Sequence, residues 1–179
     1  MNRIFERRKV WQLEWSIFHN SVELLACAIE SEYSLPDAIV SIGRGGRELG
    51  IELAKRLMLP VHHVTARHNI SDAIWSPAQN RVEVSDFDLH RIPDYERILV
   101  ADDICGSGKT LEEVRCRLAT PLSSPTIMST VLCKNVGSVL SPDFWIWTVR
   151  DWVIFPWEQV PSNVITESLP ISAHLFFEP

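Results

Sequence analysis

The chain of 179 residues is long enough for one domain with a full hydrophobic core and too short for two comfortable ones. Hydrophobic residues make up 46% and charged residues 22%, and the net charge of −6 argues against a nonspecific nucleic-acid-binding protein. No apolar stretch approaches membrane-spanning length, and the basic start of the sequence lacks the apolar segment of a secretory signal. We therefore expect a cytoplasmic protein with no membrane or nucleic-acid partner.

The first predicted elements are a helix and a βαβ unit. Apolar residues recur at helical spacing over residues 16–33, and Pro36 follows the end of that helix. Residues 38–42 indicate a strand, residues 48–59 a helix, and residues 61–66 a second strand. Because the two strands flank one helix, they are expected to be parallel neighbours in a sheet.

The loop inside this unit is Gly43-Arg44-Gly45-Gly46, at the end of the first predicted strand. Glycines let the backbone approach an anion closely, and a guanidinium can bond two phosphate oxygens at once. By itself the loop is equally consistent with a tight turn. Arg47 either assists in anion binding or is a solvated residue of the first helical turn.

Residues 68–95 form a long segment with little helical periodicity. A loop of this length in a compact domain is usually functional or mobile, although a plain surface excursion is also consistent with the sequence. Apolar and polar residues alternate over residues 80–87, which could form a hairpin arm.

The next unit carries two adjacent carboxylates. Residues 98–101 are apolar and predict a buried parallel strand, so that Asp102 and Asp103 lie at its carboxyl end. A loop of small residues follows, and residues 111–119 carry apolar side chains at helical spacing. Strand, glycine loop and helix together form a phosphate-binding arrangement, since loop amides and a helix N-terminus direct positive charge at an anion.

The sequence Gly108-Lys109-Thr110 invites comparison with the phosphate loop of nucleoside triphosphatases. In that motif the first glycine would stand at position 103, where this chain has Asp103. Two carboxylates at the mouth of the loop would repel a bare triphosphate. They suit a ligand whose hydroxyls and Mg²⁺ lie over the acids while its phosphate lies in the loop, as in a ribose 5-phosphate.

The C-terminal third contains a further strand, an aromatic segment and a tail. Residues 130–134 predict a strand that ends in Lys134, and residues 151–158 (DWVIFPWE) predict an aromatic strand end interrupted by proline. The tail over residues 161–179 either packs back on the domain or joins a dimer interface. The alternation of strands and helices predicts an α/β fold with a doubly wound, mostly parallel sheet and ligands at the carboxyl ends of its strands.

The four cysteines show no C-x-x-C spacing, so neither a metal site nor a disulfide is indicated. Cys105 lies beside the acid pair, near the predicted N-terminus of a helix, where its thiol could be reactive. A role as small packing residue is the alternative.

Residues 98–110 (ILVADDICGSGKT) resemble the phosphoribosyl-pyrophosphate (PRPP) signature of the type I phosphoribosyltransferases. The resemblance implies that Asp102 and Asp103 act in catalysis by engaging the ribose hydroxyls directly or through Mg²⁺. It assigns the 5-phosphate to a five-residue loop, namely Gly106, Ser107, Gly108, Lys109 and Thr110. It also assigns the leaving pyrophosphate to Arg44, Gly45 and Gly46, with Arg44 in a catalytic role.

The resemblance further implies a single domain over residues 1–179, with a core at about residues 35–135. N-terminal and C-terminal segments would build a small hood, and a flexible loop at about residues 68–95 would close over PRPP. Members of this family are commonly oligomers, so a homodimer is expected.

Within the family, Lys134 and the pattern W-V-x-x-P-W-E resemble the xanthine-guanine and hypoxanthine branch, particularly its archaeal-like members. This resemblance implies an acceptor site in which Lys134 hydrogen-bonds the 6-oxygen of a purine. Trp152 would stack on the ring, the Val153 backbone would read the purine edge, and Glu158 would complete the site.

Two residues depart from the pattern of this branch. Gly106 stands where the 6-oxopurine enzymes usually have an aspartate that exchanges a proton with the purine, and Asn135 stands where a proline tends to follow the lysine. A glycine cannot act as an acid or base. We therefore keep three hypotheses: transfer to a 6-oxopurine, transfer to a non-purine alcohol or amine, and a non-catalytic sensor of PRPP or nucleotides.

Overall fold

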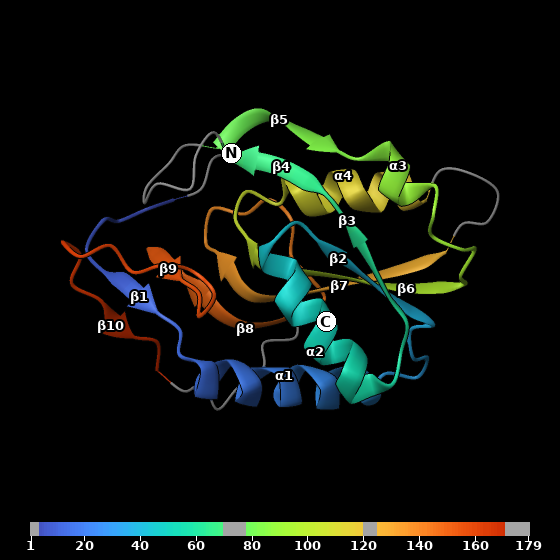
Figure 1. Ribbon diagram of the computed structural model, residues 1–179, viewed down its shortest axis with the longest axis horizontal. Helices are drawn as coiled ribbons and strands as arrows, with labels where there is room; N and C mark the ends of the chain where they lie inside the picture. Colours follow the sequence, from blue (N-terminus) through green and yellow to red (C-terminus); the bar gives the residue numbers. More distant parts are fainter. Residues whose placement is uncertain (1–3, 70–77, 120–124, 171–179) are drawn as a thin grey trace.

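A five-stranded parallel sheet forms the centre of the protein. The computed structural model describes residues 4–69, 78–119 and 125–170. The sheet has the order β3-β2-β6-β7-β8, and all its strands run in the same direction (Figure 1). Its strands are β2 (Ala38–Ile42), β3 (Val61–Val64), β6 (Arg97–Cys105), β7 (Thr126–Asn135) and β8 (Phe144–Val149). The loops that follow these strands therefore meet at one edge of the sheet.

Helices cover both faces of this sheet. On one face, α1 (Trp15–Glu30) and α2 (Gly45–Leu57) pack with Ile39 and Leu99 in one hydrophobic cluster. On the other face, α4 (Lys109–Leu118) packs with Val40 and Val100 in a second cluster. Side chains of successive strand residues point to opposite faces, and both faces of β2 and of residues 98–101 of β6 are buried and largely apolar. The expected doubly wound α/β fold is confirmed.

A second, three-stranded sheet joins the two ends of the described chain. Its order is β10-β1-β9, and it pairs β1 (Val10–Gln12) with β9 (Trp152–Ile154) and β10 (Glu167–Ser168). The described part of the C-terminal tail packs back on the domain, because Leu169 is buried and the indole Nε1 of Trp147 donates to the carbonyl oxygen of Pro170 at 2.9 Å. Residues 171–179 lie outside the described part.

An antiparallel hairpin follows β3. It pairs β4 (Ala66–Asn69) with β5 (Ala78–Val84), and the short helix α3 (Asp86–Leu89) comes next. The amide of Ser85 donates to the carbonyl of Thr65 at 2.9 Å, and the amide of Thr65 donates to the Asp88 carboxylate at 2.8 Å. The predicted hairpin arm over residues 80–87 is present in part: β5 begins two residues earlier and ends at Val84, and residues 86 and 87 belong to α3. Residues 70–77 lie outside the described part.

Several boundaries differ from the sequence prediction. β6 continues through both aspartates to Cys105, which pairs with Lys134 of β7, whereas the apolar pattern ended at residue 101. The reason is that backbone pairing with a neighbouring strand does not depend on apolar side chains. α2 begins at Gly45 rather than at residue 48, so Gly45 and Gly46 of the expected anion loop lie in the first turn of the helix. None of the helices in the described ranges has the length and apolar character of a membrane span.

Candidate active site

A cleft of about 700 Å³ lies where the loops after β2, β6 and β7 meet the small sheet. Its glycine-rich part is lined by residues 42–45, Arg47, His63, Thr65, Ala66, residues 102–108, Thr110 and Leu111, whereas the predicted residues Gly46 and Lys109 are not among the lining residues. Its aromatic part is lined by Phe5, Asn135, residues 151–153, Phe155, Trp157 and Glu158. The cleft therefore brings together both predicted anion loops, the acid pair and the aromatic segment.

The acid pair lies against the first turn of α2. Asp102 and Asp103 are half-buried, and the amide of Asp103 donates to Asp102 Oδ1 at 2.9 Å. A Cβ atom added to Gly45 would overlap the Asp103 carboxylate. A Cβ atom added to Gly46 would stand 2.5 Å from the carbonyl oxygen of Ala101 and 2.8 Å from Asp102 Cα. Glycines at these two positions let the helix N-terminus, with its partial positive charge, approach the two carboxylates.

The loop after β6 is shaped by Gly108. This residue has a φ of +88°, which L side chains rarely adopt, and an added Cβ would stand 2.8 Å from Leu140 Cβ and 3.0 Å from Ser138 Oγ. The amide of Val139 donates to the carbonyl of Ser107 at 3.3 Å, so the turn after β7 holds this loop in place. Because α4 begins immediately after Gly108, the amides of its first turn are directed toward the cleft.

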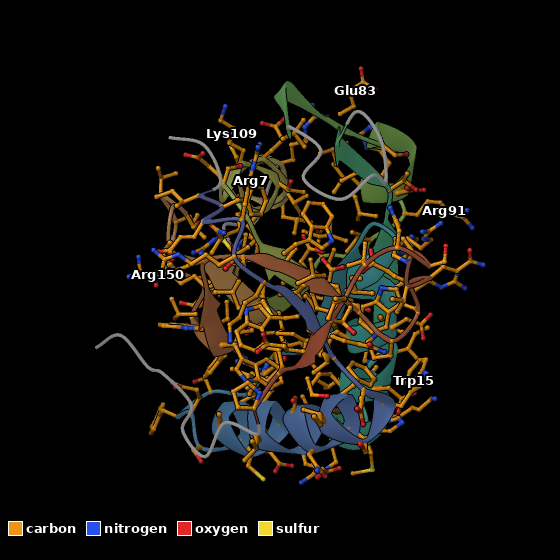
Figure 2. The ribbon with its side chains drawn as sticks, turned by 90° about the vertical axis from the view of Figure 1, so that its left-hand side faces the viewer. Arg7, Trp15, Glu83, Arg91, Lys109 and Arg150 are labelled. Atoms are coloured by element: carbon orange, nitrogen blue, oxygen red, sulfur yellow. The ribbon has the colours of Figure 1, made fainter. Side chains whose placement is uncertain are left out.

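Four of the five predicted 5-phosphate residues line the cleft: Gly106, Ser107, Gly108 and Thr110. Lys109 is the exception among them, and its half-exposed side chain lies at the same end of the molecule as Arg7, opposite Trp15 of α1 (Figure 2). This loop therefore presents backbone groups and hydroxyls to the cleft rather than the lysine ammonium.

The loop after β2 brings cationic side chains to the cleft. Gly43 has a φ of +59°, and Gly43, Arg44, Gly45 and Arg47 all line the cleft, with Arg44 and Arg47 exposed. His63 lines it as well, with its Nδ1 atom 3.3 Å from Ser41 Oγ. Burial lowers the pKa of His63 below its ordinary value, and the charge of Arg47 adds to this effect while Asp88 opposes it. The lowered pKa favours the uncharged imidazole at pH 7, so the positive charge here comes mainly from the arginines.

The aromatic part of the cleft is built on a tight turn. The amide of Phe155 donates to Glu158 Oε2 at 2.8 Å, and the amide of Glu158 donates to the carbonyl of Phe155 at 2.9 Å. The rings of Phe155 and Trp157 stack with centroids 5.2 Å apart and an interplanar angle of 4°. Trp152, Val153 and Glu158, which the resemblance assigns to the acceptor site, all line the cleft, and the Glu158 carboxylate also holds this turn.

Lys134 takes a different position from the one expected. Its ammonium donates to Ser141 Oγ at 2.7 Å and lies 4.6 Å from the centroid of the Trp145 ring. Among the described residues that line the cleft, the neighbouring Asn135 takes the place at the end of β7. The contacts of Lys134 with Ser141 and Trp145 form only when β7 and β8 pack together, and the strand pattern did not predict them.

The cleft residues that were not identified as site residues from the sequence include Phe5, His63 and Asp151. Phe5 precedes the first strand and belongs to no periodic pattern, and His63 lies in an alternating strand that looked purely structural. Asp151 immediately precedes the W-V-x-x-P-W-E pattern, which was the one available signal.

The acid pair could take part in holding a divalent cation. Carboxylate oxygens are the donors that Mg²⁺ prefers, and both carboxylates face the same cleft as the cationic loop. In the described part of the chain, no group of three or more His, Cys, Asp or Glu side chains is arranged to hold a metal. The residues therefore fit a magnesium ion that takes most of its ligands from water and a bound phosphate compound.

Comparison with known proteins agrees with this geometry. The xanthine-guanine phosphoribosyltransferase of Roseobacter denitrificans is 27% identical over 166 residues, which cover 87% of this chain and 89% of the relative. A purine phosphoribosyltransferase from Pyrococcus horikoshii has the same fold, with a TM-score of 0.67, 24% identity, and coverage of 88% of this chain and 98% of that one.

A hypothetical protein from Neisseria gonorrhoeae, crystallised with bound ppGpp, also has this fold, with a TM-score of 0.71 and 22% identity over 85% of this chain and 90% of its own. The family model of the phosphoribosyl transferase domain matches residues 15–160, which include both glycine loops, the acid pair and the aromatic segment. The chain therefore belongs to the phosphoribosyltransferase family, as a transferase that resembles the xanthine-guanine and hypoxanthine branch.

Proposed function

We propose that this phosphoribosyltransferase moves ribose 5-phosphate from PRPP to a 6-oxopurine base and releases pyrophosphate. The observation that carries the proposal is the close approach of the first turn of α2 to the acid pair: a Cβ atom added to Gly45 would overlap the Asp103 carboxylate. A sugar over the acids would thus have one anion-binding loop on each side. The similarity to xanthine-guanine phosphoribosyltransferases supports a purine as the acceptor.

In this proposal each loop holds one end of PRPP. The loop from Gly106 to Thr110 holds the 5-phosphate through its amides and hydroxyls, and Asp102 and Asp103 accept hydrogen bonds from the ribose hydroxyls. Arg44, together with the first turn of α2, holds the pyrophosphate and stabilises the charge that develops as it leaves. The two carboxylates stabilise positive charge on the ribosyl group.

Asp102 and Asp103 are also the residues that would hold Mg²⁺. When bound, the ion would neutralise charge on the leaving pyrophosphate. Everything else in the proposed chemistry depends on side chains and amides that line the cleft.

The acceptor lies in the aromatic part of the cleft in this proposal. Trp152 offers a ring for stacking, the Val153 backbone offers edge contacts, and Glu158 bounds the site. Lys134 would have to leave Ser141 to reach the acceptor. Because Gly106 has no titratable group, the acceptor proton passes to solvent or to another cleft residue. Cytoplasmic location and a homodimer stay predictions.

A pyrophosphate-release assay tests the proposal. Purified protein with PRPP and Mg²⁺ is given guanine, xanthine, hypoxanthine, adenine or a panel of alcohols and amines. We expect turnover with at least one 6-oxopurine, at a rate at least tenfold above that with adenine, and loss of turnover with EDTA that added Mg²⁺ restores.

The same assay separates the alternatives. Turnover restricted to an alcohol or amine would replace the purine by a non-purine acceptor. Binding of PRPP without turnover of any acceptor would identify a sensor and contradict the proposal.

A further inference from the structure

The segment formed by residues 4–8 lies beside the aromatic part of the cleft, far in sequence from the residues that hold it. The amide of Ile4 donates to Asn135 Oδ1 at 3.0 Å, and Asn135 Nδ2 donates to the carbonyl of Ile4 at 2.9 Å. The side chain of Asn135 thus pairs with the Ile4 backbone as a neighbouring strand would. Asn135 is only 1% exposed, so these bonds are shielded from water.

A second attachment lies a few residues further along the segment. The amide of Glu6 donates to the carbonyl of Arg150 at 3.0 Å, and the amide of Arg8 donates to Asp151 Oδ1 at 3.3 Å. The guanidinium of Arg150 also lies 3.4 Å from Glu6 Oε1. The segment is therefore held on both sides of Phe5, by the end of β7 and by the residues that lead into β9. In Figure 1 this stretch, in blue, runs on the same side of the molecule as β9.

Phe5 is the residue of this segment that reaches the cleft. Its ring centroid lies 5.6 Å from that of Trp152, with an interplanar angle of 41°, and both residues line the cleft. A flat ring stacked between them would need a separation of about 7 Å, since each contact takes about 3.5 Å. An acceptor that stacks on Trp152 therefore contacts the part of the indole that Phe5 does not cover. Phe5 blocks the part that it contacts.

A purely local role for Asn135 does not account for this arrangement. Its Oδ1 also accepts from the amide of Gly137 at 2.9 Å, which is the bond that an asparagine makes when it closes a turn. The turn does not require Nδ2, yet Nδ2 donates to Ile4. The bond from Asn135 Nδ2 therefore holds residues 4–8 and takes no part in closing the turn.

We propose that residues 4–8 form one wall of the acceptor pocket, with Phe5 as a specificity-determining residue that contacts Trp152. Asn135 is a positioning residue that acts through Phe5. The inference rests on the proposed function for the identity of the acceptor, but the wall itself is a property of the cleft. It extends the acceptor site to a part of the chain that precedes the first strand.

Steady-state kinetics of Phe5→Ala and Asn135→Ala test the wall. We expect the KM for guanine to rise at least about fivefold in both variants, while the KM for PRPP stays within about twofold of the wild type. Ile4→Ala is the matched control, because it removes an exposed side chain and keeps the backbone bonds to Asn135. Phe5→Tyr keeps the ring and should restore the wild-type KM for guanine.

Calorimetry with two ligands measures binding affinity and does not require turnover. Guanosine 5′-monophosphate carries both the base and the phosphate, whereas ribose 5-phosphate lacks the base. We expect Phe5→Ala to weaken binding of the nucleotide at least about fivefold and to leave ribose 5-phosphate within about twofold. Asn135→Ala should follow the same pattern if it folds, and Phe5→Ala suffices if it does not.

These outcomes separate the wall from the proposed function. Nucleotide binding that depends on Phe5, in a protein without purine turnover, would support the wall and contradict the function. Unchanged nucleotide affinity in Phe5→Ala, or equal weakening of both probes, would overturn the wall. So would a wild-type protein that does not bind the nucleotide at all.

Discussion

The glycine-rich and aromatic parts of the cleft are built in different ways. The glycine-rich part is built around two loops that each directly follow a strand of the central sheet, and its shape depends on close contacts at Gly45, against the Asp103 carboxylate, and at Gly46, against the backbone of β6. The aromatic part brings together Phe5, the end of β7 and residues 151–158, and the bonds between Ile4 and Asn135 join positions 131 residues apart.

Because of this difference, we expect the two parts of the cleft to respond differently to substitution. A backbone surface without spare volume can bind one shape of ligand, and most changes to it disturb the whole site. A surface made of separate side chains can change one contact at a time. We therefore expect changes in the glycine-rich part to affect every reaction of the enzyme, and changes in the aromatic part to affect the acceptor alone.

The largest effect is expected for Asp103→Asn. Loss of one charged group that stabilises the transition state should lower kcat by about 10²-fold or more with every acceptor. Circular dichroism and the thermal midpoint should stay close to the wild type, because the amide has the shape of the carboxylate. Asp94→Asn, at an exposed position outside the cleft, is the control. Full activity of Asp103→Asn with PRPP would refute the assignment of the acid pair.

Gly45 and Gly46 of α2 separate effects on turnover from effects on stability, because Gly45 lies against a side chain and Gly46 lies against backbone. Gly46→Ala places Cβ against the backbone of β6, which cannot yield, so we expect a loss of about 1–3 kcal/mol in the free energy of unfolding. Gly45→Ala meets only the Asp103 carboxylate, which can rotate. It should keep most of the stability and lose most of the turnover. Urea denaturation and kcat measured on both variants would show whether this difference exists.

Trp152→Leu tests the aromatic part. Removal of one stacking partner is worth about 0.5–1.5 kcal/mol, which corresponds to a rise of about 2- to 13-fold in the KM for the acceptor. The KM for PRPP should change little. Trp15→Leu, an exposed tryptophan of α1 that does not line the cleft, is the control. An equal rise in both KM values for Trp152→Leu would remove the distinction between the two parts.

Ser138→Ala tests the junction between β7 and the loop after β6. Its hydroxyl donates to the carbonyl of Leu140 at 2.8 Å and lies 3.1 Å from Cys105 Sγ. It also packs against Gly108, where an added Cβ atom would stand 3.0 Å from it. We expect a loss of about 1 kcal/mol in stability and a KM for PRPP raised about two- to fivefold. The thermal midpoint and both KM values measure this. A change in the acceptor KM alone would place Ser138 with the aromatic part instead.

The smallest effect concerns pH. Because burial lowers the pKa of His63 in the folded protein, the unfolded chain takes up a proton first as the pH falls through about 6.5. Its contribution to stability is therefore present above that pH and is lost below it. His63→Asn should reduce the difference in free energy of unfolding between pH 7.5 and pH 5.5, measured by urea denaturation. An unchanged difference would mean that His63 does not contribute.

Much of the glycine-rich part could be predicted from the sequence. The strand over residues 38–42, the acid pair near a strand end and the glycine-rich loop after it are local features, in which neighbouring residues determine the backbone conformation. Helix and strand ends were predicted less well, because the pairing of β6 with β7 extends beyond the apolar run. The position of the Lys134 ammonium could not be predicted either, since it depends on Ser141 and Trp145.

The sequence by itself therefore determined the fold class, through its alternation of strands and helices, and the family resemblance and the two glycine-rich loops, through short runs of consecutive residues. Only the tertiary structure decided that Gly45 lies against Asp103, that Lys134 turns to Ser141 and that Phe5 contacts Trp152. The physical reason is that local propensities act between neighbours along the chain. A contact between residues far apart in sequence depends on how whole elements pack, and no pattern in one segment records it.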